Sequence, residues 1–131
     1  MTLKAIVVED KGGVADRLSD ALATAGHRVC GVAETASELA ALLGEHRPDI
    51  VFIDLDLGER QDGIGVATLL EAGGPLAVVF IVAPADESVQ VEESRTVECS
   101  ARLVRPFTAS DLDQAIERAV SRARDAVNPS L

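Results

Sequence analysis

Carboxylates follow two short apolar runs of this chain, and their spacing points to metal or phosphoryl chemistry. Asp54 comes directly after the run Ile50–Ile53, and Glu9 and Asp10 come directly after the run that ends at Val8. Short runs rich in β-branched residues are typical of buried strands. Three acids that converge at neighbouring strand ends repel one another unless a cation is present, and Mg²⁺ takes such oxygen ligands. An Asp beside a metal can also be a nucleophile that forms an aspartyl-phosphate, whereas any one of these acids alone would equally suit an ordinary loop.

Length and composition indicate one globular domain. The chain has 131 residues, of which 47% are hydrophobic, and it lacks Trp and Tyr, so its core must be built mainly from Ala, Val, Leu and Ile. The formal net charge of −10 argues against nucleic-acid binding, because phosphates would be repelled. Because no apolar run reaches membrane-spanning length and the N-terminus lacks a signal-peptide pattern, we expect a cytoplasmic protein that does not enter the membrane. Cys30 and Cys99 are too few for a disulfide framework.

Strand and helix patterns alternate along the chain. Apolar runs predict strands at residues 3–8, 27–33, 49–53, 76–82 and 101–104, and helical periodicity predicts the segments between them, including a weak helix within 84–97. Thr35 or Ser37 would cap the second helix, and Thr108 or Ser110 the last one. Five strand–helix units predict an α/β, doubly wound, parallel sheet with helices on both faces. Residues 1–127 would form the domain, and residues 128–131 a C-terminal tail.

Four segments together carry a family resemblance: VVED, RPDIVFIDLDLG, DGIGVA and VRPFT. In this order and spacing, over about residues 3–124, the chain resembles the receiver domain of bacterial two-component response regulators. It is also similar to receivers of alphaproteobacterial stress regulators and single-domain regulators. The resemblance implies a flavodoxin-like sheet of order 2-1-3-4-5. Because no effector domain follows in this sequence, it also implies a stand-alone receiver, a single-domain response regulator.

The resemblance also implies roles for individual residues. Asp54 would accept a phosphoryl group from a histidine kinase or phosphotransfer protein. Glu9 and Asp10 would hold Mg²⁺ together with Asp54 and the backbone carbonyl of Asp56. Such a domain catalyses only its own phosphorylation and is not otherwise an enzyme.

Three positions depart from the family pattern. Arg105 stands where the family has lysine before Pro-Phe, and an Arg105–Pro106 cis peptide bond would be expected there. Val82 replaces the Ser or Thr at the end of strand four, and valine has no hydroxyl with which to bind a phosphoryl group. Arg102 replaces the aromatic switch residue. The usual hydroxyl–aromatic relay is therefore missing at both ends.

Other functions remain open. The departures would suit a pseudo-receiver, a protein-interaction module that is not phosphorylated. Asp54-Leu55-Asp56 also resembles the first motif of haloacid-dehalogenase-type phosphohydrolases, although that motif usually lies near the N-terminus. A flavodoxin-like cofactor carrier would need a phosphate-binding loop and aromatic residues that this chain lacks.

The last helix carries Arg118, Arg122 and Arg124, which we expect on a solvated face. Alternatively, these arginines belong to a homodimer surface. By resemblance, that surface would comprise the helix within 84–97, the strand at 101–104 and the last helix.

Overall fold

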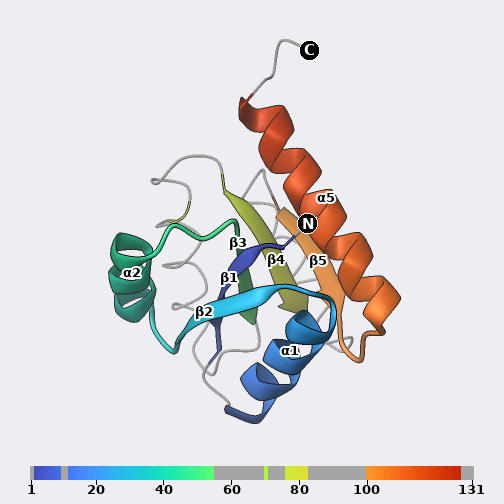
Figure 1. The fold of residues 1–131 in the computed structure, drawn as a ribbon, viewed down its shortest axis with the longest axis horizontal. Coiled ribbons are helices and arrows are strands. Elements are labelled where there is room, and N and C mark those ends of the chain that lie inside the picture. Colours follow the sequence, from blue (N-terminus) through green and yellow to red (C-terminus); the bar gives the residue numbers. More distant parts are fainter. Residues whose placement is uncertain (1, 10–11, 55–69, 71–75, 83–99, 128–131) are drawn as a thin grey trace.

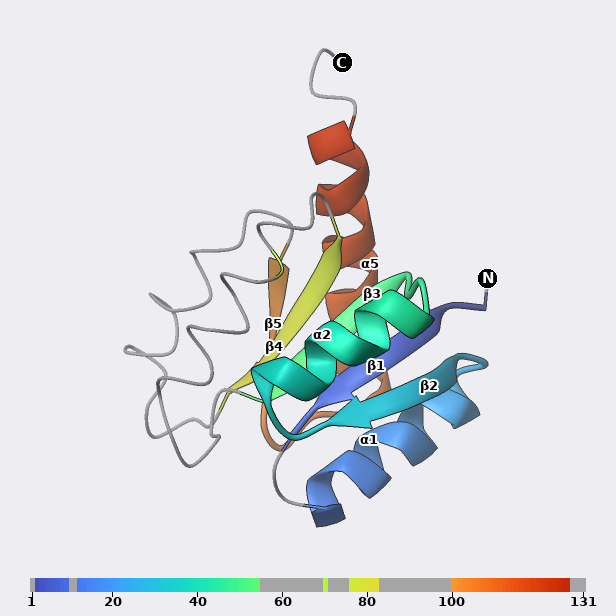
Figure 2. The same ribbon diagram turned by 90° about the vertical axis from the view of Figure 1, so that its left-hand side faces the viewer.

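The computed structural model describes residues 2–9, 12–54, 70, 76–82 and 100–127. Five strands form one sheet in the order β2-β1-β3-β4-β5, and every neighbouring pair is parallel. The arrangement is visible in Figures 1 and 2 and confirms the predicted strand order. The strands are β1 (Lys4–Val8), β2 (Arg28–Ala33), β3 (Ile50–Asp54), β4 (Ala77–Val82) and β5 (Ser100–Val104).

The predicted strand ends agree with the observed ones to within one residue, with one consequence for the site. The sequence predicts a third strand over 49–53 with Asp54 just beyond it, whereas Asp54 is the last residue of β3. Its backbone pairs with Ile81 of β4. A residue inside the ladder is held more firmly than one in a loop, so the sheet itself fixes the position of the Asp54 carboxylate.

Three described helices cover the two faces of the sheet: α1 (Gly12–Thr24), α2 (Ala36–Glu45) and α5 (Ala109–Val127). Helices α1 and α5 pack on one face and α2 packs on the other, as Figure 2 shows. The helix predicted within 84–97 lies outside the described residues. Of the helix predicted at 64–72, only Leu70 is described, and it is helical and buried.

Thr35 and Thr108 begin helices α2 and α5. The Thr35 hydroxyl accepts a hydrogen bond from the Glu38 N–H, and the Thr108 hydroxyl accepts one from the Asp111 N–H. The Asp111 carboxylate in turn accepts from the Thr108 N–H. The cap at Thr108 is therefore reciprocal, and both threonine hydroxyls satisfy an amide in the first turn of a helix. Of the alternatives left open by the sequence, Thr35 and Thr108 are therefore the caps.

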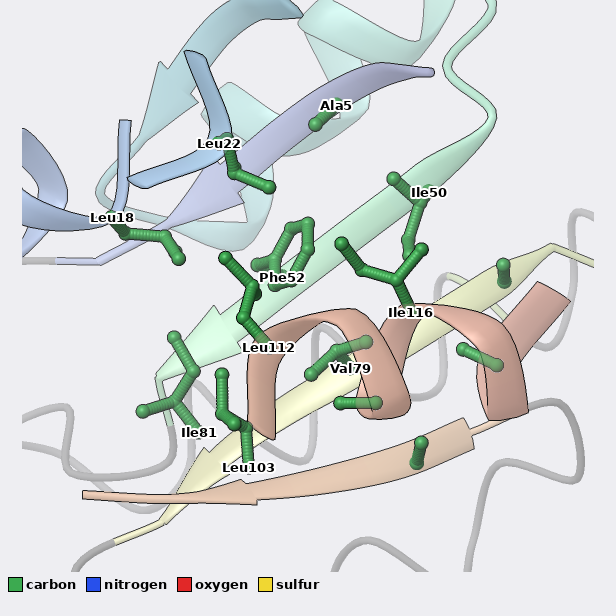
Figure 3. Close-up of a cluster of buried hydrophobic side chains, with 14 of the residues drawn as sticks. Ala5, Leu18, Leu22, Ile50, Phe52, Val79, Ile81, Leu103, Leu112 and Ile116 are labelled. Atoms are coloured by element: carbon green, nitrogen blue, oxygen red, sulfur yellow. The ribbon is translucent and has the colours of Figure 1, made fainter. Parts of the chain in front are cut away.

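Alternation along the strands divides the core into two layers. Phe52 of β3 lies at the centre of the layer beneath α1 and α5, where its ring faces Leu112 and Ile116 (Figure 3). The other layer lies beneath α2 and contains Phe80 of β4. All residues of β3 and β4 are buried, as expected for inner strands of a parallel sheet.

In the ranges that the structure describes, no helix has both the length and the apolar character needed to cross a membrane.

Candidate functional site

Two buried carboxylates lie at the carboxyl ends of neighbouring strands. The β1–β3 ladder pairs Val8 with Ile53, and the next residues along the two strands are Glu9 and Asp54. The Glu9 N–H donates to the Ala33 carbonyl at 2.8 Å, which holds Glu9 against β2. Glu9 is 2% exposed and Asp54 is 1% exposed. Burying two acids at one sheet edge is costly unless positive charge is close to them.

Arg105 supplies positive charge directly to Asp54. Its Nη2 donates to Asp54 Oδ1 at 3.1 Å and its Nη1 donates to Asp54 Oδ2 at 3.4 Å, so the planar guanidinium engages both carboxylate oxygens. The Arg105 side chain is 23% exposed, whereas that of Asp54 is 1% exposed. Asp54 is therefore the buried partner of this ion pair, and Arg105 is the partner that solvent can reach.

The backbone around Arg105 is fixed at the end of β5. The Arg105 N–H donates to the Val82 carbonyl at 2.9 Å, which continues the β4–β5 pairing by one residue. The Arg105–Pro106 peptide bond is cis, as the resemblance implied. Phe107 is half-buried and packs against the core layer beneath α5. Two residues after the arginine that contacts Asp54, the Phe107 side chain thus packs against the core.

The described part of the site fits a hard cation only in part. Glu9 and Asp54 provide carboxylate oxygens, the donor type that Mg²⁺ prefers. Asp10 and Asp56, the other expected ligands, lie outside the described residues. Within the described ranges, no group of three or more His, Cys, Asp or Glu side chains is placed to hold a metal ion.

The two expected switch positions differ sharply in their surroundings. Val82 is fully buried at the carboxyl end of β4, with 0% exposure. Arg102 is exposed on β5, where its backbone pairs with Phe80. Arg102 lines a surface groove of about 280 Å³ between β5 and α5, together with Pro106, Gln114, Arg118 and others. Position 102 supplies no aromatic ring that could turn inward, because it is an arginine.

The arginines of the last helix lie on a solvated face, as predicted, but one of them also makes a contact that the sequence does not indicate. Arg118, Arg122 and Arg124 are all exposed. Arg122 also donates through Nη1 to the carbonyl of Ser100, so it connects α5 to the start of β5. No pattern in the sequence distinguishes Arg122 from its neighbours, because the acceptor is a backbone group 22 residues away.

Sequence comparisons assign the chain to a family and give it several relatives. The response regulator receiver domain family matches residues 5–117. The transcriptional regulatory protein PdtaR of Mycobacterium tuberculosis is 33% identical over 122 residues, which cover 93% of this chain and 58% of PdtaR. The phyllosphere-induced regulator PhyR of Methylorubrum extorquens is 25% identical, with 98% of this chain and 49% of PhyR covered. The chain thus spans about half the length of these relatives. The chemotaxis protein CheY of Thermotoga maritima is 25% identical, with 90% of this chain and 98% of CheY covered.

Solved structures agree with the sequence relatives. NtrX of Brucella abortus superposes with a TM-score of 0.84 at 26% identity, over 99% of this chain and 30% of NtrX. The signal receiver domain of a modulated diguanylate cyclase from Desulfovibrio desulfuricans G20 gives a TM-score of 0.79 at 28% identity, over 95% of this chain and 98% of that domain. The fold is therefore the CheY-like, flavodoxin-type receiver fold. With its sheet order, its buried acids at the ends of β1 and β3 and this family match, the chain belongs to the response regulator receiver domain family of two-component systems.

Proposed function

We propose that this receiver accepts a phosphoryl group on Asp54 from the phosphohistidine of a histidine kinase or phosphotransfer protein. The observation that carries the proposal is the position of Asp54. Its carboxylate is buried at the carboxyl end of the middle strand of the sheet, and a guanidinium engages both of its oxygens. In doubly wound folds this edge is where ligands bind.

The proposed reaction is a simple displacement. One oxygen of the Asp54 carboxylate attacks phosphorus, the new O–P bond forms, and the P–N bond to the imidazole breaks. The electron pair of that bond passes to the imidazole nitrogen, and the net charge of the phosphoryl group moves to the receiver. Arg105 then lies beside the added negative charge and stabilises it, because a guanidinium fork suits phosphoryl oxygens as well as a carboxylate.

Glu9, Asp10, Asp54 and the backbone carbonyl of Asp56 are the proposed ligands of Mg²⁺. The ion would neutralise phosphoryl oxygens during transfer. Glu9 also makes the binding of a cation at this edge more favourable, because it adds a buried negative charge next to Asp54.

The proposed unit comprises residues 1–127, since α5 continues to Val127 and packs against the sheet. Its proposed location is the cytoplasm, where a thiol such as that of Cys30 stays reduced. Like other receivers, it would signal rather than turn over a substrate. Turnover of a generic phosphomonoester would instead favour the phosphohydrolase alternative.

A second copy of the chain is a proposed partner of the α5 surface. Glu117 and Asp125 lie on this helix beside Arg118 and Arg122, and all four line one shallow depression. Two helices related by a two-fold axis can place the acids of one against the arginines of the other. Charge reversal at the exposed Arg118 should then lower the apparent mass in sedimentation equilibrium, whereas an unchanged mass would exclude this surface.

A pseudo-receiver is the second candidate, and Val82 and Arg102 favour it. Without a hydroxyl at 82 or an aromatic ring at 102, neither group of the family relay is available. In that case the chain would bind its partner without modification, and Asp54 and Arg105 would serve as a structural ion pair.

Incubation of the protein with Mg²⁺ and a small phosphodonor, acetyl phosphate or phosphoramidate, separates these candidates. Intact-mass spectrometry of the wild type should show the gain of one phosphoryl group, and removal of Mg²⁺ by a chelator should abolish the gain. Asp54→Ala should remove the modification, whereas the matched variant Asp113→Ala, at an exposed acid of α5, should retain it. An unmodified wild type, or an Asp54→Ala variant modified as fully as the wild type, would contradict phosphorylation at Asp54.

A further inference from the structure

A groove at the amino ends of the strands lies at the opposite end of the sheet from Asp54. It has a volume of about 560 Å³ and is bordered by the starts of β1, β3 and β4 and by the last turns of α5. Most of the residues that line it are apolar, and they include Leu3, Pro48, Leu76, Val120, Ala123 and Val127. The groove and the proposed phosphorylation site share no residue.

The apolar stripe of α5 continues into this groove. Ala119 is fully buried, Val120 and Ala123 are half-buried, and Val127, one further turn along, is 63% exposed. Figures 1 and 2 show the last turns of α5 running past the start of β4. Because these positions keep the helical spacing of the buried ones, the stripe has the pattern of a face that packs against another segment, and its exposed end borders the groove.

The strand ends that border the groove are already held in place by backbone contacts. The Lys4 N–H donates to the Asp49 carboxylate at 2.8 Å, and the Asp49 N–H donates to the Lys4 carbonyl at 2.8 Å. The Leu3 carbonyl accepts from the Arg28 N–H at 2.9 Å. Because the groove is preformed in this way, a segment that fills it pays little to order the groove itself.

The residues that follow Val127 have the length and the chemistry to cover the groove. Pro129 has no N–H and disfavours a helical conformation at the residue before it, so we expect the chain to leave the axis of α5 there. Four residues span at most about 13 Å, whereas Val120 and Val127 are about 10 Å apart along the helix axis. Leu131, the one large apolar residue of this segment, can therefore reach back to the level of Val120.

We infer that residues 128–131 form an arm that folds back over this groove, with the Leu131 side chain against Leu76 and Val120. A second copy of the chain is a poorer occupant, because a stable dimer buries about 800 Å² on each partner, whereas a groove of this volume takes only a few side chains. Attachment to α5 also gives the arm a high effective concentration at the groove. The inference does not depend on the phosphorylation of Asp54.

NMR of the 131-residue chain tests the inference. In the wild type, the Leu131 methyl groups should give nuclear Overhauser effects to those of Leu76 and Val120, and the backbone order parameter of residue 131 should exceed about 0.6. In Leu131→Ser the Leu76 and Val120 methyl signals should shift, and the order parameter of residue 131 should fall below about 0.6. Leu131→Met keeps an apolar side chain of similar volume, so it is the matched control and should retain the wild-type order.

A second variant changes the groove and leaves the arm intact. Ala123→Glu places a charge in the groove and should release the arm, so the order parameter of Leu131 should fall. Ser121→Glu, at an exposed residue of the same helix, should leave that order parameter unchanged.

Three results would overturn the inference. The first is a wild-type Leu131 that has an order parameter below about 0.6 and gives no Overhauser effects to the groove. The second is a Leu131 whose order is unaffected by Ala123→Glu. The third is a set of Overhauser effects that join Leu131 of one molecule to Leu76 of another in a mixture of ¹³C-labelled and unlabelled protein, since the occupant would then be a second copy. Should Ala123→Glu fail to fold, Leu131→Ser still decides, because it changes no residue of the sheet or of α5.

Discussion

The guanidinium of Arg105 bonds both carboxylate oxygens of Asp54, although 51 residues separate the two in the chain. This contact offsets part of the repulsion between two buried carboxylates. Strand burial brings Glu9 and Asp54 to one edge of the sheet with almost no access to water, where like charges repel. Arg105, at the end of β5, forms an ion pair with Asp54 through two donors. The resting site is thus partly neutralised by the protein itself.

The two partners of this pair should differ in what their removal costs. In Arg105→Met, the buried carboxylate of Asp54 loses its fork, and we expect the free energy of unfolding to fall by about 2–3 kcal/mol. In Asp54→Asn, the arginine can turn toward solvent, so the loss should be under about 1 kcal/mol. Urea unfolding followed by circular dichroism measures both. The double variant should lose about as much stability as Asp54→Asn alone. If its loss instead equals the sum of the two single losses, the contact contributes little.

Glu9 should oppose folding and favour metal binding at the same time. In Glu9→Gln the shape is kept and one of two buried negative charges is removed, so the metal-free protein should gain roughly 1 kcal/mol in stability. The affinity for Mg²⁺, measured by isothermal titration calorimetry, should fall about tenfold or more, because an amide is a poorer ligand for a hard cation. Glu45→Gln, at an exposed residue at the end of α2, serves as the control and should change neither quantity. A variant that binds Mg²⁺ as tightly as the wild type would remove Glu9 from the proposed ligands.

Substitution of Val82 by threonine would restore the hydroxyl of the family pattern, but at a cost in stability. In Val82→Thr a hydroxyl enters a fully buried position, which should cost about 1–2 kcal/mol in the resting protein. Beryllofluoride with Mg²⁺ should recover part of this loss, because the hydroxyl then gains an acceptor. Val78→Thr is the matched control, since Val78 is also fully buried on β4 and in the same core layer but lies away from the carboxyl end. It should show a similar loss without recovery, and equal recovery in both variants would separate Val82 from the phosphoryl site.

The fold was largely predictable because hydrophobic periodicity reports burial directly. Runs such as Ile50–Ile53 and the fully buried β4 could be recognised as inner strands, and their alternation with helices led to the parallel sheet. Strand order came from the family resemblance rather than from the runs. The meeting of Glu9 and Asp54 at one edge followed from that order, since parallel neighbours end on the same side.

Side-chain contacts between distant segments were not predictable in the same way. The family resemblance could match Arg105 to the position where receivers have lysine, but its contact with both Asp54 oxygens depends on the side-chain rotamer and on how the end of β5 is held. Arg122 poses the same problem, because its acceptor is the backbone carbonyl of Ser100. A local signal was available for one choice between caps. Glu38, three residues after Thr35, has a carboxylate that accepts from the Glu34 N–H just before the helix, whereas Ala40, three residues after Ser37, has no side-chain acceptor.

The start of α5 offers a direct comparison between two hydroxyl residues that both suited a cap from sequence. In Thr108→Ala the Asp111 N–H loses its acceptor, so the free energy of unfolding should fall by about 1 kcal/mol. In Ser110→Ala only an exposed contact with the Gln114 amide is lost, at 3.3 Å, and the change should stay within about 0.5 kcal/mol. Thermal and urea unfolding of the two variants measure the difference. Equal losses would mean that the first turn of α5 is held by its packing against the sheet rather than by Thr108, and the segment after Arg105 would then owe its position to Phe107 and the core.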